Sequence, residues 1–156
     1  MSRITIELAE AATPEIAELL AELDAALEGP YAPDQRHALS IEQLFRPEVR
    51  FFLVRLEGRA VGCGGIAFLD GYAEVKRMYS RPAVRRQGVA QALLRRIESE
   101  ARRAGTTVLR IETGMHQHEA IRFYEAAGFR RRGPFGPYAR MPRHAIETSV
   151  FYEKEV

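Results

Sequence analysis

At Arg81-Pro82 the spacing of hydrophobic residues changes from that of strands to that of a helix, and this change constrains the fold more than any other feature. Before it, residues 49–57, 60–70 and 72–80 are predicted strands that follow one another through short turns. Asp70-Gly71 separates the second segment from the third, and this dipeptide is a strong β-hairpin signal. The three segments therefore predict an antiparallel meander.

After Arg81-Pro82 the apolar residues recur at the spacing of a helix. One stripe of this predicted helix consists of Val89, Leu93, Ile97, Ala101 and Ala104. Gly105 follows the stripe and is the residue type that most often ends a helix. A strand is predicted next, at 107–114, so residues 72–113 form a strand–helix–strand unit. Such a unit implies two roughly parallel strands joined by a right-handed crossover.

The remaining segments complete a mixed pattern of strands and helices. Thr13-Pro14 opens a predicted helix that Gly29-Pro30 ends, and residues 40–43 have the spacing of a capping box for a second, short helix. The other predicted elements are strands at 3–8, 129–133 and 148–156 and a helix at 119–128. With 156 residues and no repeat or linker, the chain fits one domain of class α+β. We expect three layers (α/β/α): one mixed sheet covered by helices on both faces.

Cysteine content and hydropathy exclude several classes of protein. The single cysteine, Cys63, excludes an internal disulfide framework and a multi-cysteine zinc site, and it suits a reducing compartment. No apolar run approaches the roughly 18 residues of a spanning helix, and the first ten residues lack the core of a signal peptide. We therefore expect a cytoplasmic protein.

Charge is divided unevenly along the chain. Residues 1–75 carry 6 basic and 13 acidic side chains, whereas residues 76–156 carry 17 basic and 8 acidic ones. All the basic residues except Lys76 and Lys154 are arginines. One guanidinium group can donate two hydrogen bonds to two oxygens of the same phosphate. The arginine-rich second half of the chain therefore suggests a phosphate-bearing partner. The alternative is that most of these arginines only solvate the surface.

The segment 85–90, Arg-Arg-Gln-Gly-Val-Ala, lies between a predicted strand and the start of a predicted helix. The free N–H groups and the helix dipole at such a place form an anion site. Gly88 would let the backbone approach a bulky anion, and Arg85 and Arg86 add positive charge. The spacing matches neither the phosphate-binding motif G-x-x-x-x-G-K-[ST] nor the dinucleotide-binding motif G-x-G-x-x-G. ATP hydrolysis and dinucleotide redox chemistry are therefore disfavoured. Taken alone, the segment could also be an ordinary exposed loop.

This segment resembles the acetyl-CoA-binding signature [Q/R]-x-x-G-x-[G/A] of the GNAT N-acetyltransferase superfamily, through Arg85, Gly88 and Ala90. Residues 120–129, AIRFYEAAGF, resemble the A-I-x-x-Y-x-x-x-G-F segment of the same family. The chain departs from the pattern at Gln117, where many members have Asn. Residues 133–142 and 149–156 resemble small-molecule-type bacterial members whose substrate is uncertain.

The resemblance implies one GNAT domain over 1–156 that moves an acetyl group directly from acetyl-CoA, as co-substrate, to the primary amine of a small molecule, with no metal. It implies that strand 72–80 parts from strand 107–113 and that the pantetheine arm lies in the gap. The residues expected to bind the coenzyme are Met78, Tyr79, Ser80, Arg85, Arg86, Gln87, Gly88, Val89, Ala90, Thr113, Gln117 and Ala120.

Three side chains are candidates for catalysis. Tyr124 matches the general-acid tyrosine of the family, and the alternative is a packing residue on an apolar helix face. Glu74 and Glu112 lie on neighbouring predicted strands and could take the proton of the amine, although an isolated strand Glu is more often a cross-strand partner of Lys or Arg. Cys63 lies in an apolar strand with no adjacent His, so we expect a buried hydrophobe and not an acetyl carrier.

Several alternatives remain open at this stage. The chain could be a catalytically silent acyl-CoA-binding or regulatory module, or an acetyltransferase for a protein or peptide N-terminus. Asp24, Glu28 and Asp34 lie in the region that covers the acceptor side in the family, which would suit a cationic acceptor. The basic, aromatic tract 130–143 has the composition of a nucleic-acid platform, but a solvated edge or acceptor-site loop explains it more simply. Family members often form homodimers, and no feature of the sequence identifies an interface.

Overall fold

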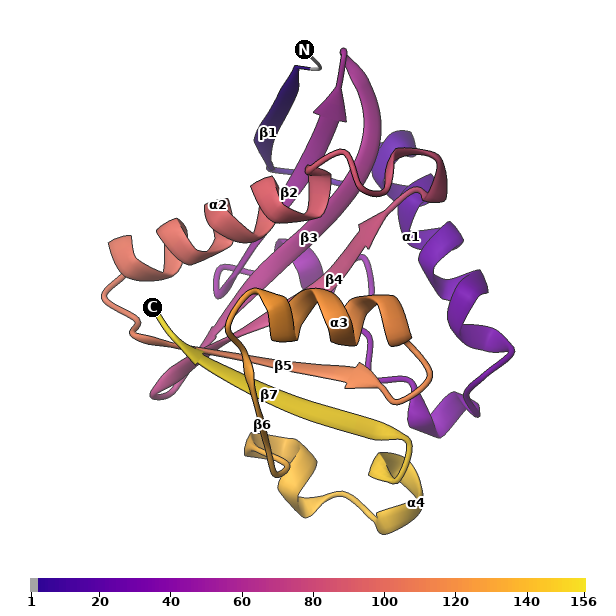
Figure 1. Ribbon diagram of the computed structural model, residues 1–156, viewed down its shortest axis with the longest axis vertical. Coiled ribbons are helices and arrows are strands. Elements are labelled where there is room, and N and C mark those ends of the chain that lie inside the picture. The colour runs from indigo at the N-terminus through magenta and orange to yellow at the C-terminus, as the bar shows by residue number, and fades with distance from the viewer. Residues whose placement is uncertain (1–2) are drawn as a thin grey trace.

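Residues 3–156, the part of the chain that the computed structural model describes, form one mixed sheet of seven strands in the order β1-β2-β3-β4-β5-β7-β6 (Figure 1). Met1 and Ser2, which belong to the N-terminal stretch considered above, lie outside the described residues. The strands are β1 (Ile4–Ala9), β2 (Val49–Leu56), β3 (Arg59–Leu69), β4 (Tyr72–Ser80), β5 (Val108–Gly114), β6 (Arg130–Arg132) and β7 (Ser149–Glu155). The helices are α1 (Pro14–Glu28), α2 (Val89–Arg103), α3 (His118–Ala126) and α4 (Arg143–Ile146).

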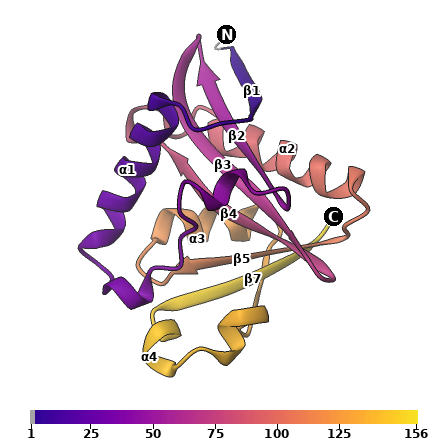
Figure 2. The same ribbon diagram turned by 180° about the vertical axis from the view of Figure 1, so that it is seen from behind.

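Helices cover both faces of the sheet, as the sequence predicts. Helices α2 and α3 lie on the face turned to the viewer in Figure 1, and α1 lies on the opposite face, seen in Figure 2. The alternation within β2 serves both layers: Phe52 and Val54 pack in the core with α2, whereas Phe51 and Leu53 pack in the core with α1. Cys63 is fully buried in the α1 layer. None of the helices formed by residues 3–156 is long and apolar enough to cross a membrane.

The observed elements follow the local signals closely, with a few differences. Thr13 caps α1 by accepting the N–H of Ile16 at 3.3 Å. Ser40 and Gln43 exchange the hydrogen bonds of a capping box, but the turn they start is a short 3-10 helix at Gln43–Phe45 and not an α-helix. Ala104 is exposed at the end of α2 and does not extend the buried stripe. The tract 130–143, for which we expected a solvated edge or a loop, contains a 3-10 helix at Gly136–Arg140, and α4 begins at its end.

Strands β4 and β5 are parallel neighbours that pair over a very short length. Their register contains only Ala73 with Leu109 and Glu74 with Arg110. Beyond these pairs the strands diverge, as Figure 1 shows. Strand β4 is also irregular against β3 at this point, because Arg77 has a φ of 57°, in the left-handed region. The resemblance stated above implies this parting of the strands, and the structure places the opening after Glu74.

The end of β5 is tied to the segment that follows α1. The hydroxyl of Tyr31 accepts the N–H of His116 at 2.9 Å and donates to Oε1 of Gln117 at 3.2 Å. Its ring passes so close to Gly114 that a Cβ at this glycine would overlap the phenol. The contact therefore requires glycine at position 114, and it fixes the entry to α3 against the 31–38 segment.

We expect Gly114→Ala to lower the free energy of unfolding by roughly 1–3 kcal/mol, because the added methyl displaces Tyr31 from its two hydrogen bonds. Gly29→Ala is the matched control, since Gly29 has helical torsion angles and open space around its Cα. Urea unfolding of the two variants checks the difference. Equal stabilities would contradict the close contact between Tyr31 and Gly114.

Candidate active site

A large groove of about 1020 Å³ runs from the N-terminus of α2 to α3, along the diverging end of β4. Most of the predicted coenzyme-binding residues line it, and they come from three separate parts of the chain. They are Met78, Tyr79, Ser80, Arg85, Arg86, Gly88, Val89, Ala90, Gln117 and Ala120. Gln87 is not among them, because its side chain turns back to donate to the carbonyl of Ala83 at 3.4 Å. His116 and His118 also line the groove.

One end of the groove is the N-terminus of α2. Gly88 has a φ of 84° and precedes the helix, and the first hydrogen bond of the helix runs from the N–H of Ala92 to the carbonyl of Gly88 at 3.0 Å. The N–H groups between these two residues have no carbonyl within the helix to bind. Arg85 donates to the carbonyl of Ser80 at 3.3 Å and pairs with Glu119 at 3.2 Å, which places its charge beside the same loop. This end of the groove suits a bulky anion.

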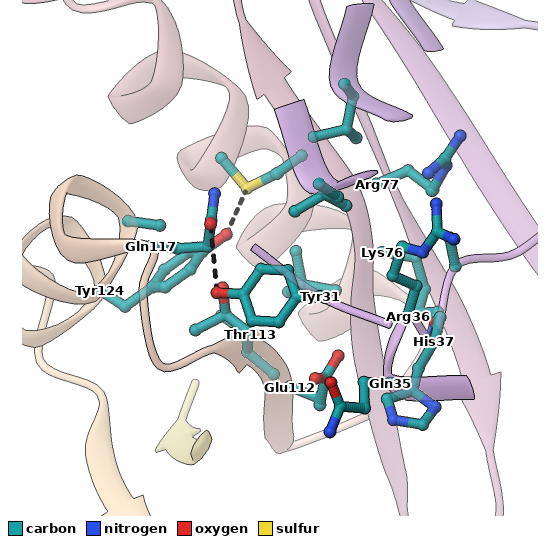
Figure 3. A pocket seen from close by; sticks show the side chains of 18 residues that line it. Tyr31, Gln35, Arg36, His37, Lys76, Arg77, Glu112, Thr113, Gln117 and Tyr124 are labelled. Carbon is teal, nitrogen blue, oxygen red and sulfur yellow. Dashed lines mark hydrogen bonds between the residues drawn. The ribbon is translucent and has the colours of Figure 1, made fainter. Parts of the chain in front are cut away.

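A smaller pocket of about 140 Å³ opens from the other side of the parted strands. Segment 31–38, the second half of β4, the end of β5 and the C-terminal half of α1 form its walls (Figure 3). The pocket and the groove share a wall, made of Leu23, Met78, Gln117, Ala120 and Tyr124. Thr113, a predicted coenzyme contact, lines the smaller pocket and not the groove. Two molecules bound on the two sides would therefore meet at this shared wall.

Tyr124 stands in the shared wall and is 6% exposed. Its hydroxyl donates to Sδ of Met78 over 3.8 Å. Burial raises the pKa of the Tyr124 phenol, and the negative charge of Glu112 raises that pKa further. The phenol therefore keeps its proton at neutral pH and can act as a proton or hydrogen-bond donor.

Glu112 lines the smaller pocket, and its carboxylate accepts the Ser149 hydroxyl at 2.7 Å. Burial raises the pKa of Glu112 above its usual value, although the Ser149 hydrogen bond and the charges of His37 and Lys76 act in the opposite direction. A carboxylate whose pKa is raised toward neutrality is a better base than an exposed one.

Glu74 does not line the smaller pocket or the groove. It is 6% exposed, and its carboxylate accepts the Tyr138 hydroxyl at 2.7 Å and the Lys76 ammonium at 3.2 Å. Lys76 Nζ also donates to Tyr138 at 3.1 Å and to the carbonyl of His37 at 3.2 Å. The structure thus brings Glu112 together with Tyr124 around the pocket but places Glu74 in a buried network beneath it.

The acidic residues expected to face a cationic acceptor do not line the pocket. Asp24 pairs with Arg77 at 2.7 Å, Asp34 lies 3.3 Å from His144, and Glu28 is absent from both linings. The pocket instead contains several residues that the sequence did not suggest. They are Tyr31, Gln35, Arg36 and His37 of segment 31–38, with Lys76 and Arg77 of β4. An irregular segment has no hydrophobic period that could assign its side chains to a cavity.

Cys63 lines neither the groove nor the pocket. Burial raises the pKa of the Cys63 thiol to about 12, so it is not a thiolate at neutral pH. Residues 3–156 contain no group of three or more His, Cys, Asp or Glu side chains arranged to hold a metal ion.

Known proteins share this fold and these motifs. Residues 15–129 match the family model described as the acetyltransferase (GNAT) family. A protein named IAA acetyltransferase from Azospirillum brasilense is 40% identical over 156 residues, which cover 99% of each chain. The structure of an acyl-CoA N-acyltransferase from Klebsiella pneumoniae has a TM-score of 0.77 and 35% identity over 97% of each chain. A GNAT family acetyltransferase from Elizabethkingia anophelis with acetyl-CoA bound shares the fold at 20% identity, with a TM-score of 0.71 over 98% of each chain.

The raised pKa of Glu112 predicts a pH-dependent effect on stability. Between the ordinary pKa of 4.5 and the raised value, the folded state binds more protons than the unfolded state, so the stability due to Glu112 falls as pH rises. Glu112→Gln removes the ionisable group and with it this fall in stability. We therefore expect its stability relative to the unmodified protein to increase as pH rises above about 4.5. Urea unfolding from pH 4 to 8 measures the trend.

Glu153→Gln is the control with the opposite sign. A hydrogen bond from Arg110 lowers the pKa of Glu153, so this carboxylate contributes stability above pH 4.5 and loses it as pH falls further. Its substitution should give a stability deficit that stays constant above pH 4.5. If Glu112→Gln gave the same flat profile, the raised pKa of Glu112 would be wrong.

Proposed function

The chain belongs to the GNAT family of acetyltransferases and is an acetyl-CoA-dependent N-acetyltransferase, and from this premise we propose that its acceptor is the primary amine of a small molecule. The observation that carries the proposal is the shared wall. A groove suited to the coenzyme and a pocket of about 140 Å³ meet at Tyr124, and Glu112 lines the pocket. A proton donor and a proton acceptor thus flank the place where two substrates would meet.

The chain's own groups fit the parts of acetyl-CoA in order along the groove. The N–H groups at the start of α2, with Arg85 and Arg86, would hold the diphosphate. Residues 78–80 follow the two β4–β5 pairs, so their backbone groups on that side remain available to a pantetheine arm. Gln117 and Ala120 of the α3 region would form the opposite wall, with Thr113 facing the acceptor side. The acetyl group would then lie near Met78 and Tyr124.

Tyr124 would act as the general acid. Direct transfer forms a bond between the amine nitrogen and the acetyl carbon and breaks the carbon–sulfur bond. The departing thiolate then takes a proton, and the Tyr124 phenol holds one because burial raises its pKa. Placement beside the sulfur offsets the weak acidity of the phenol.

Glu112 would act as the base that takes the proton of the amine, directly or through a water molecule. It lines the acceptor pocket, and burial raises its pKa. Glu74 remains the second candidate, acting from the network with Lys76 and Tyr138. Glu74 does not line the pocket itself and is connected to it through Lys76, which does.

Two features support a small acceptor. The pocket is small, and a relative that covers 99% of this chain is named IAA acetyltransferase. A protein or peptide N-terminus is the second candidate acceptor, and a catalytically silent acyl-CoA-binding module is the alternative that lacks transfer. Release of thiol from acetyl-CoA, measured with pools of small amines and with peptides, tests all three. Coenzyme binding with no thiol release for any acceptor would contradict the proposal.

We expect Tyr124→Phe to lower kcat by roughly 10²- to 10⁴-fold, because the thiolate loses its proton donor while the ring packing is kept. The KM for acetyl-CoA should stay within a few-fold. Tyr152→Phe is a matched control, because it also removes a buried hydroxyl, one that donates to Glu125 at 2.8 Å away from both cavities. Equal kcat values for the two variants would remove Tyr124 from the mechanism.

We expect Glu112→Gln to lower kcat/KM by about 100-fold or more and to abolish the rise of kcat/KM with pH that ionisation of the base produces. Glu74→Gln should retain that rise, because Glu74 lies in the network with Lys76 and Tyr138. The pH profiles of the two variants distinguish the candidates. If both retain the rise, water or another group takes the proton.

A further inference from the structure

The smaller pocket is lined by basic side chains much more than by acidic ones. Arg36, His37, Lys76 and Arg77 line it, against the single acid Glu112. This composition is unexpected for an enzyme whose acceptor is only a cationic amine, because like charges destabilise one another in a partly buried site. The four basic groups differ in whether they already have a hydrogen-bond partner in the protein.

Two of the four have their hydrogen bonds within the protein. Lys76 Nζ, on a side chain only 10% exposed, reaches Glu74, Tyr138 and the carbonyl of His37. The His37 ring bonds the carbonyl of Ala145 through Nε2 at 2.7 Å. Lys76 and His37 therefore hold the pocket wall together and have little to offer to a ligand.

The two arginines differ from these residues. Arg36 is half-buried and makes no ion pair with any carboxylate among residues 3–156, and its Nε is buried without a hydrogen-bond partner. Arg77 pairs with Asp24 through one terminal nitrogen, and its Nε is likewise buried without a partner; its side chain is 5% exposed. A buried N–H of a charged group that lacks an acceptor costs free energy, and such groups are rare in native proteins, where a ligand, an ion or an ordered water can supply the acceptor.

The arginines lie away from the reacting groups. Figure 3 shows the side chains of Arg36 and Arg77 on one side of the pocket and those of Tyr124 and Gln117 on the other. A molecule that spans the pocket would therefore present one end to Tyr124 and the other to the arginines.

Building on the function proposed above, we propose that the acceptor carries a carboxylate as well as its amine, so that it is an amino acid or a similar aminocarboxylate. The carboxylate binds at the guanidinium of Arg36, while the amine lies near Glu112. The Arg36 guanidinium lines the pocket and makes no ion pair with any carboxylate among residues 3–156, and guanidinium–carboxylate pairs are strong and directional. A phosphate would bring a third oxygen and more charge into a pocket of about 140 Å³ that also contains Glu112.

The test compares acceptors that differ only in this group. Thiol release from acetyl-CoA is measured with a set of L-amino acids, with the amide of each, and with the corresponding amine that lacks the carboxyl group. The amide keeps the size but removes the charge, and its amine loses a proton more easily, so intrinsic reactivity favours the amide. We expect kcat/KM for the best amino acid to exceed that for its amide by at least about 10-fold, mostly through KM, as the loss of a charged hydrogen bond predicts.

Arg36→Gln tests the assignment of the residue. It should lower kcat/KM for the amino acid by roughly 10- to 100-fold, and that for the amide much less, so that the preference for the acid disappears. Arg102→Gln, on the exposed face of α2, is the control that should keep the preference. Because the ratio of two acceptors is measured on one protein, partial unfolding of a variant does not imitate this result.

The outcomes separate this inference from the proposed function. An acid-to-amide ratio near one in the unmodified protein, or a ratio unchanged by Arg36→Gln, overturns the carboxylate subsite and leaves the small-amine acetyltransferase in place. No thiol release with any amino acid, amide or amine overturns both. The carboxylate subsite is supported if the acid-to-amide ratio of kcat/KM falls to about one in Arg36→Gln but stays high in Arg102→Gln.

Discussion

Both cavities of this structure depend on the short pairing of β4 with β5. Two residue pairs join the strands, and beyond Glu74 and Arg110 each strand follows its other neighbour in the sheet. A parallel sheet that continued to pair would have no opening, and its backbone groups would all be used. The divergence makes room for the groove on one face and the pocket on the other. It also leaves the backbone of residues 78–80 available at the place where the two cavities meet.

The open end of β4 is held in place from the side of α1. Arg81 pairs with Glu18 and Glu22 of this helix, and Glu22 also accepts the Tyr79 hydroxyl at 3.0 Å. The Asp24–Arg77 pair lies next along the helix, at the irregular position of the strand. These side-chain contacts hold the end of β4 where it no longer pairs with the backbone of β5. Since the exposed carboxylates contribute little as single pairs, the series of pairs along one helix is what fixes the strand.

The sequence predicted the elements whose residues follow a period and failed on those that do not. The meander of β2 to β4, the stripe of α2 and the loop before it depend on local spacing and turn chemistry, and the structure has them within a few residues. Segment 31–38 and segment 136–146, which contains a 3-10 helix and α4, have no such hydrophobic period. They are positioned by contacts distant in sequence, such as Gln35 with the carbonyl of His144 at 3.1 Å and His37 with that of Ala145. The choice between Glu74 and Glu112 could not be made for the same reason, because it rests on Tyr138 and Ser149, which approach only in the folded chain.

The uneven charge of the two halves of the chain has a structural meaning that differs from the one the sequence suggested. Most acidic side chains of α1 pair with arginines: Asp24 with Arg77 of β4, Glu18 and Glu22 with Arg81 just after β4, and Glu15 with Arg55 of β2 at 2.8 Å. Arg77 and Arg81 belong to the positive half and Arg55 to the negative half, so helix α1 is neutralised from both, and the net charge of a segment does not describe the pocket beside it. Arg36 lies in the acidic half and yet is the lining arginine of the pocket without a carboxylate partner among residues 3–156. Under the proposal made above, recognition of the acceptor depends on how the folded chain pairs the charges around this pocket, which the net charge of a sequence segment does not describe.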